Sequence, residues 1–200
     1  QVRVELPEHE VVEGVSPMMV DLEGVPGVAA LVTISTAKLG ARLRLYDGVG
    51  RIVAESEPIG RGFRWLHQVG AGPTGPHGET EVIAVRTPHI GGIVEAYRLV
   101  GDRLERVASH AGYSSHRLGS PNLDMALLAD VDADGRVDLV VPTDGMTALG
   151  LLTRSAEGFD TLGELPLGAT LASNLAAAVD EDGRLHLAAA TDDGRLRVFH

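Results

Sequence analysis

The chain has 200 residues, 44% of them hydrophobic, which suits one folded domain and argues against disorder. Its net charge of −11 argues against nucleic acid or an anionic membrane surface as a partner, because both require clustered Lys and Arg. The lack of cysteine excludes disulfides, zinc–thiolate sites and thiol nucleophiles, and no apolar run reaches the ~18–20 residues of a transmembrane segment.

Short apolar runs, punctuated by glycine and proline along the whole chain, predict an all-β fold. Val2, Val4 and Leu6 alternate with polar residues, so residues 1–7 are predicted to form a strand. Residues 173–179 fit either a short helix or a strand. The remaining strands are predicted, in chain order, at 18–22, 29–35, 42–46, 51–54, 81–86, 93–99, 103–108, 138–142, 148–153, 159–162, 186–191 and 195–199.

The strand pattern repeats about every 50 residues, with strands joined by tight turns such as Asp47-Gly48 and Asp193-Gly194. Four strands in each repeat are typical of a β-propeller blade. We therefore predict an all-β, propeller-type domain of about four four-stranded antiparallel blades. The approximate repeats are 15–60, 61–112, 113–166 and 167–200.

The last repeat lacks its fourth strand, which leaves two interpretations open. In one, the strand over residues 1–7 completes the last blade and closes a small ring, which removes exposed sheet faces. In the other, the 200 residues are part of a larger propeller. The chain begins at Gln1 without a signal peptide, so we expect an exported protein (periplasmic or extracellular) whose leader has been removed, or a segment of something longer.

The densest chemical motif is Asp130-Val-Asp132-Ala-Asp134-Gly135-Arg-Val-Asp138. Calcium prefers six to eight hard oxygen ligands, and acids at alternate positions of a tight loop supply several. Asp130, Asp132, Asp134 and Asp138 are therefore the predicted calcium ligands. The alternative is a solvated acidic turn, in which Asp and Gly are favoured for backbone reasons alone.

This motif resembles the FG-GAP (VCBS-type) repeat of integrin-like β-propellers, in which a D-x-D-x-D-G-x-x-D loop joins the first two strands of a blade. The resemblance implies a calcium-binding propeller, and its blade layout covers nearly the whole chain. Residues 64–67, 87–92 and 114–120 are similar to segments of uncharacterised bacterial FG-GAP repeat proteins, which implies a fold and no particular activity.

The other repeats retain fewer acids. Asp21 and Glu23 remain in the first copy and Glu81 in the second, so neither is expected to hold calcium tightly. Asp180 and Asp182 in the fourth copy are weaker metal candidates.

Three histidines, His67, His89 and His116, fall in or beside successive irregular segments, where propeller loops gather at one end. If they converge, they predict a ligand or metal pocket, with Arg64 and Arg117 as an anion clamp and Trp65 as an aromatic floor. The alternatives are that the histidines are separate loop residues and that Trp65 fills the core.

The preferred function is a non-enzymatic, calcium-stabilised binding or scaffold module with an unknown protein or small-molecule ligand. The alternative is an enzyme or metal-binding protein whose site lies around His67, His89 and His116. No G-x-S-x-G motif supports a serine hydrolase. Calcium is the expected ion, and zinc or another transition metal is not expected.

Overall fold

The computed structural model describes residues 2–14 and 16–200, which form strands and connecting turns without a helix. The prediction of an all-β fold is confirmed. Gln1, the start of the strand predicted over 1–7, and Val15, the start of the first predicted repeat, lie outside the described residues. Within the described part of the chain, no helix has the length and apolarity needed to cross a membrane.

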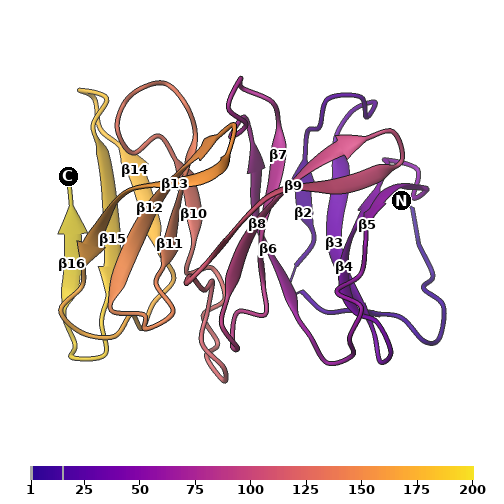
Figure 1. Ribbon diagram of the computed structural model, residues 1–200, viewed down its shortest axis with the longest axis horizontal. Coiled ribbons are helices and arrows are strands. Elements are labelled where there is room, and N and C mark those ends of the chain that lie inside the picture. Colours follow the sequence, from indigo (N-terminus) through magenta and orange to yellow (C-terminus); the bar gives the residue numbers. More distant parts are fainter. Residues whose placement is uncertain (1, 15) are drawn as a thin grey trace.

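The strands group into four consecutive antiparallel units that lie side by side along the long axis (Figure 1). The first unit contains β1 (Val11–Val12), β2 (Met18–Val20), β3 (Ala29–Thr36), β4 (Gly40–Tyr46) and β5 (Ile52–Ser56). The second contains β6 (Leu66–Gly72), β7 (Glu81–Arg86), β8 (Ile93–Val100) and β9 (Arg103–Ala111). The third contains β10 (Leu127–Ala129), β11 (Asp138–Pro142), β12 (Ala148–Ser155) and β13 (Gly158–Pro166), and the fourth β14 (Ala176–Val179), β15 (Leu185–Ala190) and β16 (Leu196–Phe199).

The sheets do not form four separate blades. Strands β5 and β9 pair in parallel at Glu55–Arg103 and Ser56–Leu104, which joins the first two units into one curled, nine-stranded mixed sheet. The third unit is a separate four-stranded sheet and the fourth a three-stranded sheet. A ring of four blades therefore stays a prediction, although the repeated strand order is present.

The core consists of apolar layers between successive units. In β7, Val82 and Ala84 pack toward the first unit, whereas Ile83 and Val85 pack toward the third. The same alternation in β11 divides its apolar side chains between the second and fourth units. Because side chains in a strand point alternately to the two faces, the inner strands are buried on both faces and read as continuous apolar runs.

The predicted strand over residues 1–7 is wrong for the described residues 2–7, which have no strand pairing. Leu6 packs on the apolar cluster of Val32, Ile34 and Tyr46 on the outer face of the first unit. Leu6 therefore covers part of a sheet face, whereas Val2 and Val4 are exposed. This segment and β16 lie at opposite ends of the molecule, so it does not complete the last sheet (Figure 1).

Two other sequence expectations are settled by the fold. Residues 176–179 form strand β14, so the strand interpretation of 173–179 is confirmed and the helix interpretation is wrong. The second strands start at Ala29, Glu81 and Asp138 as predicted, and the fourth starts at Leu185, one residue before His186.

Candidate functional site

The acidic loop joins β10 to β11 at one end of the third unit. Ala129, the last residue of β10, pairs with Asp138, the first residue of β11, so the loop leaves and re-enters the sheet at adjacent positions. Two residues of the loop, Ala133 and Gly135, have φ values of 60° and 87°, in the left-handed region that glycine adopts most easily. The loop is tight enough for Asp130, Asp132 and Asp138 to lie close to one another.

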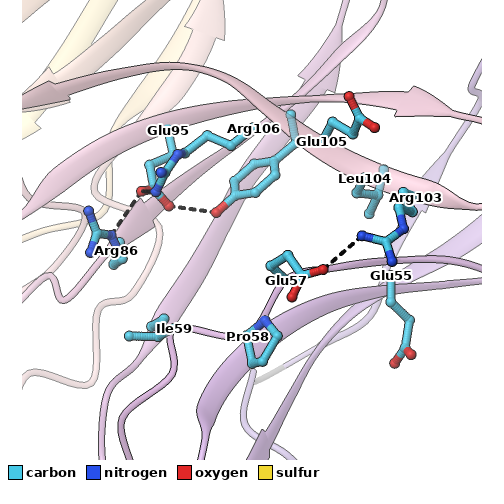
Figure 2. A pocket seen from close by; sticks show the side chains of 11 residues that line it. Glu55, Glu57, Pro58, Ile59, Arg86, Glu95, Arg103, Leu104, Glu105 and Arg106 are labelled. Carbon is cyan, nitrogen blue, oxygen red and sulfur yellow. Dashed lines mark hydrogen bonds and ion pairs between the residues drawn. The ribbon is translucent and has the colours of Figure 1, made fainter.

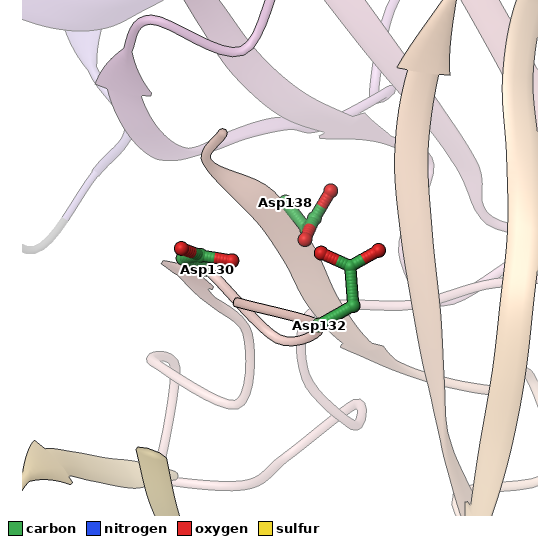
Figure 3. Close-up of side chains that lie close together, drawn as sticks. All are labelled: Asp130, Asp132 and Asp138. Carbon is green, nitrogen blue, oxygen red and sulfur yellow. The ribbon is translucent and has the colours of Figure 1, made fainter. Parts of the chain in front are cut away.

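Asp130, Asp132 and Asp138 each place a carboxylate oxygen within 4.8 Å of the others (Figure 3). Asp138 is only 2% exposed, and burial, reinforced by the charges of Asp132 and Asp134, raises its pKa above the ordinary value. One oxygen of Asp130, Oδ1, is buried without a hydrogen-bond partner among the described residues. Crowding these carboxylates, with Asp138 and one oxygen of Asp130 desolvated, is unfavourable on its own and favourable around a cation.

Asp134, the fourth predicted ligand, is directed elsewhere. Its carboxylate accepts hydrogen bonds from the backbone N–H and the Nε of Arg136, each over 2.8 Å. The hydrogen bonds from Arg136 hold the pKa of Asp134 below its usual value. The structure therefore brings three of the four predicted calcium ligands together and pairs the fourth with an arginine.

The donors fit calcium better than they fit a transition metal. All of them are hard carboxylate oxygens, with the buried Oδ1 of Asp130 free of other hydrogen bonds. Among the described residues, this is the one group in which three metal-ligating atoms lie within 4.8 Å of one another.

The corresponding loops in other units are organised differently. Asp180 accepts backbone hydrogen bonds from Asp182 and Arg184 over 2.9 Å and lies 2.8 Å from Nε2 of His186, so its oxygens close a turn. Asp182 is exposed. In the second unit, the buried Glu81 stands where Asp138 stands in the third, and its charge is neutralised by arginines.

A second cluster forms at the start of β6 from the three predicted histidines. The ring centroid of His116 lies 4.9 Å from that of His67, 4.5 Å from that of His89 and 4.7 Å from that of Trp65. His67 belongs to β6, His89 to the turn between β7 and β8, and His116 to the segment after β9. The three histidines and Trp65 therefore come together, as the convergence hypothesis requires. We call these four residues the histidine cluster.

Hydrogen bonds to backbone carbonyls hold the segments of the histidine cluster together. Thr87 donates to the carbonyl of Trp65 over 2.7 Å, which ties the β7–β8 turn to the start of β6. Ser114 donates from Oγ to the carbonyl of Pro88 over 2.6 Å, and its N–H donates to the carbonyl of Pro142. The segment carrying His116 is thus held between the second and third units.

Ser115, which the sequence did not single out, links two of the histidines. Its Oγ lies 2.9 Å from Nδ1 of His67 and 3.1 Å from Nδ1 of His116, and the serine is fully buried. The only hint in the sequence is that Ser115 directly precedes His116. Its contact with His67, 48 residues away, depends on the packing of three segments.

Burial keeps the imidazoles neutral. It lowers the pKa of His67 to about 4 and that of His116 to about 3, and it also lowers the pKa of the less buried His89. Among the described residues, the two arginines of the predicted anion clamp make no hydrogen bond to the three histidines, so the clamp stays a prediction. Arg64 donates to the carbonyl of Phe63 over 2.9 Å, and Arg117 is exposed.

A further group of charged residues was not predicted. Glu95 in β8 is fully buried and accepts hydrogen bonds from Arg86 and Arg106 over 2.8 and 2.7 Å (Figure 2). It also accepts a hydrogen bond from the hydroxyl of Tyr97. These residues line a polar cavity of about 570 Å³ beside β5 and β9. The two arginines compensate the buried charge of Glu95, so we interpret these pairs as structural.

Compared with known proteins, the chain matches no family model and no curated protein.

Proposed function

We propose that this protein is a calcium-stabilised, β-propeller-type binding or scaffold module without enzymatic activity. Its antiparallel units follow one another in the same strand order and bury apolar layers between them, as propeller blades do. The FG-GAP resemblance of the 130–138 loop supports the same interpretation. Its ligand is a protein or small molecule, and its compartment lies outside the cytosol, where calcium is abundant.

The observation that carries this proposal is the convergence of Asp130, Asp132 and Asp138, together with the unpartnered Oδ1 of Asp130. A calcium ion at this position would neutralise the three charges and tie the β10–β11 loop to the start of β11. Its role is then to stabilise the third unit. An ion present at 100 times its dissociation constant adds ~2.7 kcal/mol to the free energy of unfolding.

The test is thermal unfolding and calorimetric titration of the purified protein in chelator and in excess calcium. Calcium should raise the melting temperature and bind at one site per chain. Asp138→Asn should lose both effects, whereas the matched control Asp102→Asn, an exposed turn residue, should retain them. Equal melting temperatures in chelator and calcium, with no heat of binding, would exclude the proposed ion.

The Asp138→Asn variant also distinguishes a loss of ion binding from a loss of folding stability. Without calcium, Asp138→Asn removes a desolvated charge from a crowded carboxylate group, so it should be at least as stable as the parent at pH 7. With calcium it should be less stable than the parent. A variant that is equally destabilised in both conditions would indicate a structural defect and would not support calcium binding.

A further inference from the structure

Three ring nitrogens of the histidine cluster are buried without hydrogen-bond partners among the described residues. They are Nε1 of Trp65, Nδ1 of His89 and Nε2 of His116. Buried polar atoms are almost always paired, and three unpaired ones in contacting rings are unusual. His116 is only 1% exposed, so bulk water does not satisfy its Nε2. The cluster therefore has an unused capacity to bind something.

The donor atoms of the cluster point to the class of ligand. Three imidazole rings lie against one another, and two of their nitrogens, Nδ1 of His89 and Nε2 of His116, are buried without a hydrogen-bond partner among the described residues. Imidazole nitrogens are common ligands of metal ions. A cavity of about 240 Å³ that reaches His67 is also lined by Asp124, whose negative charge favours the entry of a cation.

Ser115 holds two of the rings in the way that metal-ligating histidines are usually held. Its hydroxyl oxygen has two lone pairs and can accept an N–H bond from Nδ1 of both His67 and His116. Both rings then keep an unprotonated Nε2. A metal-bound histidine characteristically donates its other ring N–H to such an acceptor, which fixes its tautomer and orientation.

We propose that His67, His89 and His116 form a binding site for one divalent transition-metal ion, with Ser115 as a positioning residue. Imidazole ligands suit zinc, copper, nickel and cobalt, and three histidines are a known zinc set. Among the described residues, no choice of one nitrogen from each of the three histidines places all three within 4.8 Å of one another. At least one ring must therefore rotate for the histidines to surround an ion. His89 is suited to this rotation because it lies on a turn and is only half-buried.

This site is separate from the calcium loop. The histidine cluster joins the start of β6 to the β7–β8 turn, whereas the acidic loop joins β10 to β11. The donors also differ, with nitrogens in one site and carboxylate oxygens in the other. The failure of either proposal therefore leaves the other intact.

The chain contains its own reporter, because Trp65 is its only tryptophan and contacts both His89 and His116. We would titrate cobalt(II) into chelator-treated protein and follow tryptophan fluorescence and visible absorption. Saturable quenching at one ion per chain, with an absorption band of the intensity given by four- or five-coordinate cobalt, is expected. Added zinc should reverse both signals. No quenching in excess cobalt would overturn the proposal.

Variants locate the ion. His116→Gln and His89→Gln should abolish saturable quenching, and Ser115→Ala should weaken cobalt binding about 10- to 100-fold. Because His116 is buried, its variant could fail to fold, in which case His89→Gln decides. If His89→Gln melts at the parent temperature and binds cobalt as tightly as the parent, the assignment is wrong.

The matched control is His186→Gln. The rings of His186 and His200 lie 5.9 Å apart on the surface and offer a competing pair of ligands. The control should leave quenching unchanged, as should Asp138→Asn. Loss of cobalt binding in His186→Gln with retention in His89→Gln would assign the ion to the surface pair and overturn the proposal.

Discussion

Arg154 of β12 donates from Nε to the carboxylate of Glu81 in β7 over 2.9 Å, across the boundary between the third and second units. Glu81 is fully buried and Arg154 is 5% exposed in its side chain. In the third unit, the acid at the start of β11, Asp138, lies among other acids. In the second unit, the acid at the corresponding position, Glu81, is instead neutralised by the guanidinium of Arg154 from the third unit. The pair therefore links the second and third units through a buried charged contact.

Removing Arg154 should strongly destabilise the fold. Arg154→Met leaves the buried Glu81 with the partly exposed Arg98 as its remaining cation, so we expect a loss below the ~3–5 kcal/mol of a buried charge left fully unpaired but above that of an exposed pair. Urea unfolding at pH 7 measures this loss. Arg103→Met, which breaks the exposed pair with Glu57, should lower the free energy of unfolding by less than about 1 kcal/mol. Similar losses in the two variants would contradict this interpretation.

Stability should fall as the pH drops below about 6.5 because of the buried histidines. Burial lowers the folded pKa of His67 to about 4 and that of His116 to about 3, so the unfolded state binds more protons as the solution is acidified. Their contribution to the free energy of unfolding is complete above the pKa of the unfolded state. It is lost as the pH falls toward the pKa values of the folded state, at about 1 kcal/mol per pH unit for each histidine.

Urea midpoints between pH 7 and pH 5 measure this slope before most carboxylates titrate. His67→Gln should reduce it by about half, whereas His9→Gln, in an exposed residue, should leave it unchanged. Asp138 acts in the opposite direction, because its raised pKa removes stability as the pH rises. A flat profile from pH 7 to pH 5 would mean that the histidines are solvated or protonated in the folded state.

Gly92→Ala should disrupt the packing of the histidine cluster's supporting turn. A Cβ at this position would lie 1.9 Å from the carbonyl oxygen of Tyr113, so backbone must move. We expect a loss of about 2 kcal/mol or more in the free energy of unfolding. Gly48→Ala, where an added Cβ meets nothing within 4 Å, should change stability by less than about 0.5 kcal/mol. Differential scanning calorimetry of both variants makes the comparison.

The acidic loop should respond unequally to substitution of its carboxylates. Asp132 contributes an oxygen to the converging trio, whereas both oxygens of Asp134 are occupied by Arg136. Asp132→Asn should therefore weaken calcium binding by about tenfold or more, and Asp134→Asn by clearly less. Calorimetric titration distinguishes them. Equal effects would mean that Asp134 exchanges its arginine for the ion, as the four-acid motif alone predicts.

Local patterns in the sequence were sufficient for most of the strands. The prediction of strands at 81–86 and 138–142 matches β7 and β11, because continuous apolar runs between turn residues are a strong local signal. The same local signal misplaced residues 2–7. Alternation reveals that Leu6 needs an apolar surface, but it cannot reveal whether that surface is a neighbouring strand or a sheet face.

The sites depend on contacts that no local pattern contains. The spacing of Asp130, Asp132 and Asp138 encodes their convergence, since all three lie on one short loop. The link from Ser115 to His67 arises only when three segments pack together. Asp134 lies apart from the trio because a competing donor, Arg136, donates to it within the loop itself.

The fourth unit is covered on one face alone. Leu187 and Ala189 of β15 pack against the third unit, whereas Val179, Leu196 and Val198 are more than half exposed. The inner strands β7 and β11 are enclosed from both sides, so their amide hydrogens should exchange with solvent only through large opening events. Amide exchange in β14–β16 requires only that the one apolar layer between the third and fourth units separate. A deuterium-labelling time course should therefore begin in the fourth unit and reach β7 last.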